Sequence, residues 1–250
     1  MLACMLTSLL CWQDPAPVPA PADARPAPAA APRVVEVLDD KAAKEVAAEL
    51  EKAVGGSASL ADKSRALDRI DGSSHTRLLK PLANLVEKDK SLVIRKRAAV
   101  LLRDQPKDDA MATIRALLKS PRVRPQPGVL AELVRGMSLC GYDPKSWREI
   151  DGLFEADYQP ERVPLQEALL ELITAHKEKQ AIELLLRNLD EPTPENVHDA
   201  DNPPKEYWEA RWKAWSVWKS KVKDALFAIT GQRFSTTNEA RAWLQKNPLR

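Results

Sequence analysis

Leu82-Ala83-Asn84-Leu85-Val86 is one of four copies of a five-residue pattern, apolar-x-x-apolar-apolar, which recurs near the end of stretches with helical periodicity. The other three copies are Ile114 to Leu118, Ile150 to Phe154 and Ile182 to Leu186. Their first residues lie 32, 36 and 32 positions apart, a spacing typical of a helix-pair repeat rather than of a globular enzyme domain. The pattern therefore predicts an all-α protein built from repeated helix pairs.

A second apolar patch precedes each copy by about sixteen residues: Ala66 and Ile70, Ala98 and Leu102, Val134 and Met137, Ala168 and Leu172. Each repeat should therefore hold two amphipathic helices, and neither can bury its apolar stripe alone. Stacking the pairs side by side buries the stripes. We expect the pairs at residues 59–70 with 75–88, 91–104 with 108–119, 129–140 with 144–155, and 164–176 with 178–190.

The segment before the repeats predicts a capping helix over residues 35–54, which ends at Gly55-Gly56. Strands are not expected, because the chain has only 8 glycines and few β-branched runs.

The second pair carries a family resemblance. Val93 to Leu102, followed by Ile114 to Leu118, resembles a HEAT repeat, and the resemblance extends over about residues 58–190. It implies a short α-solenoid of about four HEAT-like helix pairs, with helical caps at both ends. Residues 34–190 would hold the repeats and the amino-terminal cap, and residues 207–250 a Trp-rich carboxyl-terminal cap.

Four tryptophans, Trp208, Trp212, Trp215 and Trp218, follow one another at spacings of four, three and three, and lysines and arginines lie between them. This spacing places the indoles along one stripe of a helix over 207–229. They could stack on sugars or bases, but we expect them to pack on the last repeat. Ala225 to Phe234, with Trp243 to Pro248, resembles a closing motif of secreted bacterial HEAT-repeat proteins.

The amino terminus predicts export. Residues 1–12 form an uncharged apolar run, too short to span a bilayer but typical of the apolar core of a secretory signal peptide, although no basic residue precedes it. Cys11 offers a lipidation site, but Leu10 before it is larger than such sites normally have. Residues 13–33 are rich in Ala and Pro and predict a disordered, extended linker. Cys140 is expected to be a small buried hydrophobe.

The charge pattern does not favour a polyanion. The 38 basic and 36 acidic residues are interspersed and give a net charge of +2. The densest basic spot contains Arg115, Lys119, Arg122 and Arg124. It supports an alternative reading, a cytoplasmic nucleic-acid-binding repeat protein, although nucleic acid is not the expected partner.

No catalytic, cofactor-binding or metal-binding residues are predicted, because the chain lacks phosphate-loop, paired-Cys and His-x-x-x-His patterns. His75, His176 and His198 fall at turns or loops, and His176 should act as a helix-end cation. The polar loop 191–206 contains Glu195, His198, Asp199 and Asp201 in no recognised metal-ligand spacing. We expect a chain that is not an enzyme, has no cofactor and has no transmembrane span.

The resemblance implies a non-catalytic protein-binding or scaffolding role in the periplasm or cell envelope, through the ridge formed by the second helices. The candidate ridge residues are Asn84, Glu87, Arg115, Lys119, Asp151, Glu155, Glu183 and Arg187. Their mixed charges predict a polar protein partner, whose identity the sequence does not give. A glycan-binding module that uses Trp208, Trp212 and Trp215 is a further alternative.

Overall fold

The computed structural model describes residues 34–54, 58–194 and 202–249, and this part of the chain is all-α. Its α-helices are α1 (Asp40–Val54), α2 (Leu60–Arg69), α3 (Leu79–Lys88), α4 (Leu92–Leu102), α5 (Lys107–Lys119), α6 (Pro127–Gly141), α7 (Val163–His176), α8 (Ile182–Arg187), α9 (Lys205–Thr230) and α10 (Thr237–Lys246). Shorter 3₁₀ helices are η1 (Thr76–Leu78), η2 (Pro144–Glu149), η3 (Asp151–Leu153), η4 (Pro160–Arg162) and η5 (Lys179–Ala181).

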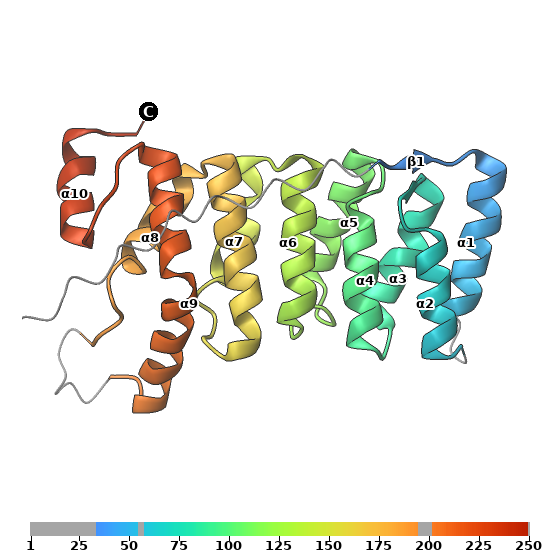
Figure 1. Ribbon diagram of the computed structural model, residues 1–250, viewed down its shortest axis with the longest axis horizontal. Helices are drawn as coiled ribbons and strands as arrows, with labels where there is room; N and C mark the ends of the chain where they lie inside the picture. Colours follow the sequence, from blue (N-terminus) through green and yellow to red (C-terminus); the bar gives the residue numbers. More distant parts are fainter. Residues whose placement is uncertain (1–33, 55–57, 195–201, 250) are drawn as a thin grey trace, which may run out of the picture. The chain divides into compact units, whose positions relative to one another are not determined.

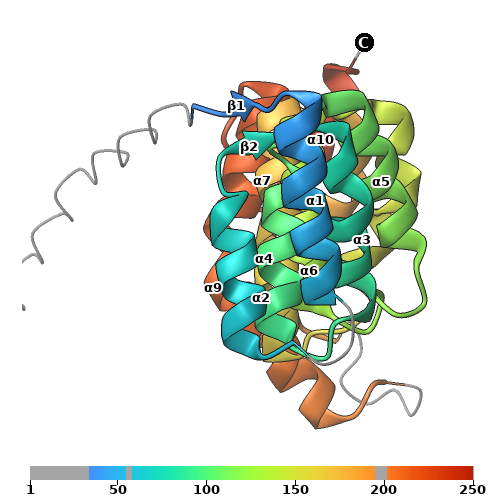
Figure 2. The same ribbon diagram turned by 90° about the vertical axis from the view of Figure 1, so that its right-hand side faces the viewer.

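The helices pack in two layers (Figures 1 and 2). In one layer α2, α4, α6, α7 and α9 follow one another, and each contacts the next. In the other, α1 contacts α3, α3 contacts α5, and α8 contacts α10. The layers meet where α1 packs on α2, α3 on α4, α5 on α6, and α8 on α9. Most helices therefore bury an apolar stripe against both a sequence neighbour and another helix of their own layer.

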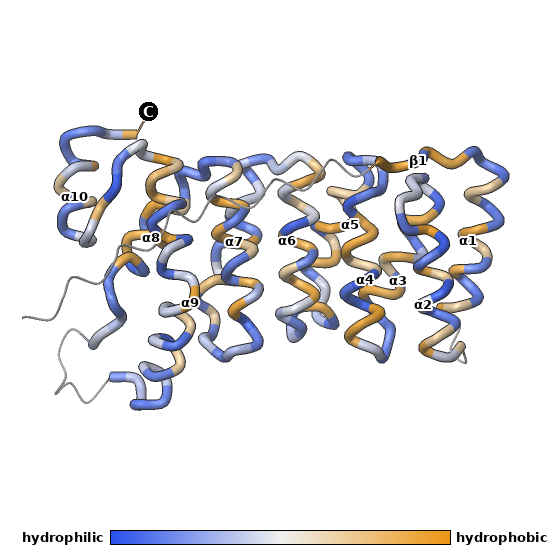
Figure 3. The backbone as a smooth tube through the Cα atoms, in the orientation of Figure 1, coloured by the Kyte–Doolittle hydropathy of each residue, from blue (hydrophilic) through white to orange (hydrophobic). Residues whose placement is uncertain are grey.

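The predicted apolar residues form a continuous core between the layers. Leu82, Ile114 and Ile150, which open three of the four repeated patterns, are fully buried. Figure 3 shows apolar and polar residues alternating within single helices, as one buried face and one solvated face require. Helices α5 and α6 approach closely at Gly136, where an added Cβ would lie 3.0 Å from Cδ1 of Ile114.

Most helix bounds agree with the predictions to within three residues, because local signals set them. Ser59 caps α2 through a reciprocal bond with Asp62, the capping box. Gly231 ends α9 in the left-handed conformation at a φ of 71°, and Thr236 accepts a hydrogen bond from the Glu239 amide at the start of α10. Pro81 lies in the first turn of α3, where a missing amide costs no hydrogen bond.

The prediction that strands are absent is wrong at one place. Strand β1 (Glu36–Val37) pairs in parallel with β2 (Ser73–Ser74). The β-branched run that begins at Val34 favours extended backbone, and the Glu36 amide donates to the Gly72 carbonyl. The predicted capping helix is therefore shorter than expected and begins at Asp40, where the Asp39 carboxylate accepts from the Ala42 amide.

The predicted second helix of the third pair, 144–155, is also wrong. The segment forms η2 and η3, which are separated at Ile150 by a non-helical φ of −126°. Gly152 lowers helix propensity, and the Asp151 side chain accepts from the Gly152 amide at 2.6 Å. Ile150 and Phe154 are nevertheless buried as the repeated pattern predicts, and Trp147 is buried beside them.

The predicted signal peptide (1–12), with Cys11, and the predicted Ala/Pro linker (13–33) lie outside the described residues. Within residues 34–54, 58–194 and 202–249, no helix has the combination of length and apolar character needed to cross a membrane.

Candidate binding surface around helix α9

The charged ridge residues predicted in the first repeats are bonded to side chains of neighbouring elements. Arg115 of α5 donates from Nε to Glu149 of η2 at 3.0 Å, and Lys119 lies 3.3 Å from the same carboxylate. The Ser120 hydroxyl donates to Glu87 of α3 at 2.8 Å. These charges therefore link successive helices of the second layer instead of standing free for a partner.

The later ridge residues follow the same pattern. Arg187 of α8 pairs with Glu155 at 2.7 Å, and Arg241 of α10 pairs with Glu183 at 3.0 Å. Asn84 instead accepts from Lys88 of its own helix at 3.1 Å. Most charged ridge residues thus form ion pairs with neighbouring elements. Glu87 bonds to a hydroxyl instead, and Asn84 and Asp151 bond locally.

Glu155 gives this chain a testable pH dependence. Burial opposes ionisation of Glu155, but hydrogen bonds from Arg187 and Asn188 outweigh it and hold the pKa of the carboxyl below its ordinary value. A pKa lowered by folding stabilises the protein above the ordinary carboxyl pKa, and this contribution declines below that value until it is lost as pH falls through the lowered pKa of the folded state. In urea titrations, Glu155→Gln should lower the free energy of unfolding by about 1 kcal/mol at pH 6, and the difference should shrink by pH 3.

The control for this pH dependence is Glu51→Gln, at an exposed carboxylate of α1. Its free energy of unfolding should differ from that of the wild type by the same amount at every pH from 6 to 3. If the difference in the free energy of unfolding between the wild type and Glu155→Gln stayed constant across this range, the proposed role of the ion pair would be contradicted.

The predicted basic spot is partly neutralised. Glu149 pairs with both Arg115 and Lys119, and its own pKa is lowered, first by the hydrogen bond from Arg115. Arg122 and Arg124 are exposed, and the Arg122 carbonyl accepts from Arg95 at 2.8 Å. Arg122 and Arg124 therefore have no carboxylate partner among the described residues.

The two described histidines take structural positions. His75 precedes η1 and accepts from the Arg77 amide through Nδ1 at 3.1 Å. His176 is the last residue of α7, and its Nε2 lies 3.0 Å from the hydroxyl of Ser138. Sequence reasoning missed this Ser–His pair, because its members are 38 positions apart. Among the described residues no carboxylate bonds the other ring nitrogen, so the pair lacks the third group of a hydrolytic triad.

Cys140 is buried as predicted, and its Sγ lies 3.7 Å from the Arg103 carbonyl. Burial raises the pKa of the thiol, which disfavours the reactive thiolate form.

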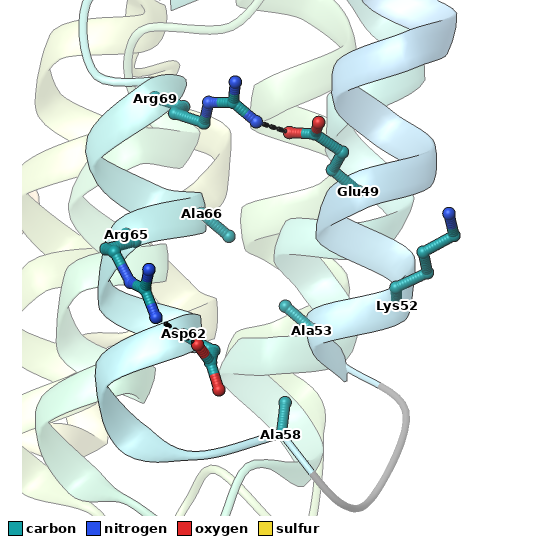
Figure 4. Close-up of a pocket in the computed structure, with 8 residues that line it drawn as sticks. All are labelled: Glu49, Lys52, Ala53, Ala58, Asp62, Arg65, Ala66 and Arg69. Carbon is teal, nitrogen blue, oxygen red and sulfur yellow. Dashed lines mark hydrogen bonds and ion pairs between the residues drawn. The ribbon is translucent and has the colours of Figure 1, made fainter.

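A pocket of about 440 Å³ lies between α1 and α2 (Figure 4). Its walls are small side chains such as Ala53 and Ala66, and its charges are already paired: Arg69 with Glu49, and Arg65 with Asp62. The remaining cation, Lys52, points away from the pocket in Figure 4. Its polar groups are thus occupied within the protein, which leaves little for recognition of a ligand.

The tryptophan stripe lies on α9, as predicted, but its members differ in burial. Trp218 is fully buried, Trp208 and Trp215 are half-buried, and Trp212 is 46% exposed. The Trp212 indole donates to Glu191 at 2.6 Å. Trp218 therefore packs fully on the core as expected, whereas the tryptophans nearer the start of the helix are only partly buried.

The first turns of α9 extend past the core. The helix has 26 residues, and its buried side chains begin only at Ala214. Figure 1 shows the amino-terminal end of α9 reaching below the neighbouring helices. Two hollows flank this half of the helix: a groove toward the segment Tyr158–Val163 and a cleft toward α8 and α10.

The groove has a volume of about 320 Å³ and is mostly apolar. Its floor and walls comprise Tyr158, Pro160, Val163, Ala210, Ala214 and Val217, and its rim carries Gln159, Glu206, Glu209 and Lys213. Val217 is 53% exposed. An apolar hollow with a charged rim is the usual anatomy of a protein contact site.

The cleft on the other side of α9 has a volume of about 730 Å³ and is more polar. Its lining includes Arg187, Asp190, Trp208, Arg211 and Arg241. The Arg211 guanidinium lies 5.4 Å from the centre of the Tyr158 ring and 5.7 Å from that of Trp208. Two aromatic rings therefore lie within cation–π distance of the guanidinium.

Tyr158 is part of this aromatic group, and burial raises its pKa to about 12. The ring also contacts Tyr207 edge-on, with 5.6 Å between ring centres. The sequence predicted the helix that carries Arg211 but not this arrangement, because Tyr158 comes from a segment about fifty residues earlier.

No group of three or more potential metal ligands occurs in the described ranges. The candidate metal-capable residues Glu195, His198, Asp199 and Asp201 lie outside those ranges.

Comparisons with known proteins do not assign the chain to a family. No protein-family model matches it, and neither the curated proteins nor the solved structures yield a match.

Proposed function

We propose that this chain is an α-solenoid of HEAT-like helix pairs that binds or scaffolds a protein partner, and that residues 1–12 direct its export to the periplasm or cell envelope. The serial two-layer packing of helices supports the architecture, since each pair contacts the next. Stacked helix pairs present an extended surface and commonly serve as binding scaffolds.

The apolar groove beside α9 is the observation that carries the proposal. Its walls include Tyr158 and Val217, and the charged residues at its rim can orient a partner. The predicted ridge is a weaker candidate, because most of its charges already form ion pairs within the protein. We therefore place the main partner contact at the groove and treat the ridge as part of the scaffold.

Val217→Glu tests this proposal. The substitution places a charge at the mouth of the groove on an exposed side chain, so the fold should tolerate it while partner binding weakens tenfold or more, about 1.4 kcal/mol. The partner is first captured in the native host by a photo-crosslinking amino acid at position 217. It is then purified, and its affinity for the full chain is measured by calorimetry.

Val93→Glu is the matched control, since Val93 is also an exposed valine, 60% accessible, but lies on α4. It should leave the affinity within about twofold. The proposal fails if position 217 crosslinks no protein, or if both variants bind the purified partner as the wild type does.

Two other functions receive less support. The nucleic-acid reading depends on the basic spot, of which Arg115 and Lys119 are paired with Glu149. The glycan reading depends on accessible indoles, of which Trp212 is the most exposed but is bonded to Glu191. Neither observation weakens the protein-binding proposal.

A further inference from the structure

Two side chains that line the cleft between α8, α9 and α10, Trp208 and Arg211, have a buried donor atom without an acceptor. The indole Nε1 of Trp208 and the Nε of Arg211 are buried, and neither has a hydrogen-bond partner. Among the described residues, Arg211 makes a long hydrogen bond of 3.5 Å from Nη2 to the Arg187 carbonyl. No described carboxylate lies within ion-pair distance of Arg211. A buried donor without an acceptor is costly, so each such group calls for an explanation, and a bound ion or ligand close to the guanidinium is one.

The two carboxylates that line the same cleft already accept hydrogen bonds. Both oxygens of Asp190 accept from the Thr237 amide at 3.1 Å, at the start of α10. Glu191 accepts from the Trp212 indole. A ligand that enters the cleft therefore meets an arginine without a described carboxylate partner and two carboxylates that already accept hydrogen bonds, which favours a ligand with an acceptor group.

Arg211 is held in a conformation suited to such a ligand. Tyr158 and Trp208 contact its guanidinium at 5.4 and 5.7 Å, so little side-chain entropy remains to be lost on binding. A fixed guanidinium plane matches the two oxygens of a carboxylate, with which arginine forms paired hydrogen bonds.

The charge of the cleft points to a monoanion. Three arginines, Arg187, Arg211 and Arg241, line it together with Asp190 and Glu191. Arg187 and Arg241 are already paired with Glu155 and Glu183, so Arg211 is the lining arginine without a described carboxylate partner, and it can balance one negative charge. A phosphate dianion would need a stronger positive field, and sugar hydroxyls would need free acceptors as well as donors.

We infer that this cleft binds a side-chain carboxylate of an acidic peptide segment, and that Arg211 is the residue that recognises it. The inference rests on the proposed protein-binding function and gives the partner a chemical character. The apolar groove and the carboxylate cleft flank the same half of α9, so one partner segment could contact both.

The test uses the full chain and two pools of fluorescein-labelled octapeptides, degenerate at the outer positions, with Glu-Glu at the centre of one pool and Gln-Gln at the centre of the other. By fluorescence anisotropy at low salt, the wild type should bind the Glu pool about tenfold more tightly than the Gln pool. Arg211→Gln should reduce this preference to within about twofold, and Arg211→Lys should lower it severalfold, because lysine keeps the charge but lacks the planar fork.

Arg124→Gln is the charge-matched control, since Arg124 is an exposed arginine distant from α9 in sequence, and it should preserve the preference for the Glu pool. Equal binding of the two pools by the wild type would overturn the inference, as would equal losses in Arg211→Gln and Arg124→Gln. Thermal unfolding checks the fold, and if Arg211→Gln does not fold, the wild-type preference and Arg211→Lys decide the outcome.

A neutral oligosaccharide, maltohexaose, serves as the glycan probe. Binding of maltohexaose that shifts tryptophan emission, without a preference for the Glu pool, would replace the carboxylate inference with a glycan site. Failure here is distinct from failure of the groove proposal, because Val217→Glu and crosslinking at position 217 report on partner binding independently of Arg211.

Discussion

Trp218→Ala should lower the free energy of unfolding by about 3–5 kcal/mol. Trp218 is fully buried between α9 and α7, and its ring meets that of Phe154 edge-on at 5.2 Å. Its indole also donates to the buried Gln166 side chain at 3.0 Å. The substitution leaves a large cavity and a buried amide oxygen without its donor. Urea denaturation monitored by far-UV circular dichroism measures this change in the free energy of unfolding, provided that the wild type and the variant have the same m-value.

The control is Trp212→Ala, which removes an indole of the same helix that is 46% exposed. It should cost no more than about 1 kcal/mol, chiefly the hydrogen bond to Glu191. Equal losses in the two variants would contradict the conclusion that Trp218 anchors the carboxyl-terminal helices to the core.

Arg95→Met should lower the free energy of unfolding by about 2–4 kcal/mol. Arg95 is almost fully buried on α4, and it donates to the Val86 carbonyl at 2.7 Å and to the Arg122 carbonyl at 2.8 Å. Methionine conserves much of the apolar stem of the side chain. The expected loss of stability therefore comes from the two hydrogen bonds to the Val86 and Arg122 carbonyls. One of these carbonyls lies in the last turn of α3, where a cation is also favourable.

The comparison variant is Arg97→Met, two residues along the same helix. Arg97 pairs with Asp68 near the surface, and removal of such a pair should cost less than about 1 kcal/mol. Thermal and urea unfolding of both variants should separate them clearly. An Arg95→Met protein as stable as the wild type would mean that water replaces both hydrogen bonds.

The sequence by itself determined the helical class and most helix bounds. Apolar residues at spacings of three and four define the buried faces, and short-range signals such as Ser59 with Asp62 or the left-handed Gly231 define the ends. These signals act within one or two turns of the chain, so they can be read without knowledge of the neighbours. Where they conflicted, as at Asp151-Gly152, the expected helix became two 3₁₀ segments.

Only the tertiary structure decided which side chains act together. The β1–β2 pair joins segments 37 residues apart, Trp218 meets Gln166 across 52 positions, and Arg211 lies over Tyr158 from another segment. The same holds for the ridge, whose charges looked free in the sequence but are paired between repeats. Periodicity fixes the face of a helix that is buried, whereas the partner of a given polar group depends on packing distances that no local pattern encodes.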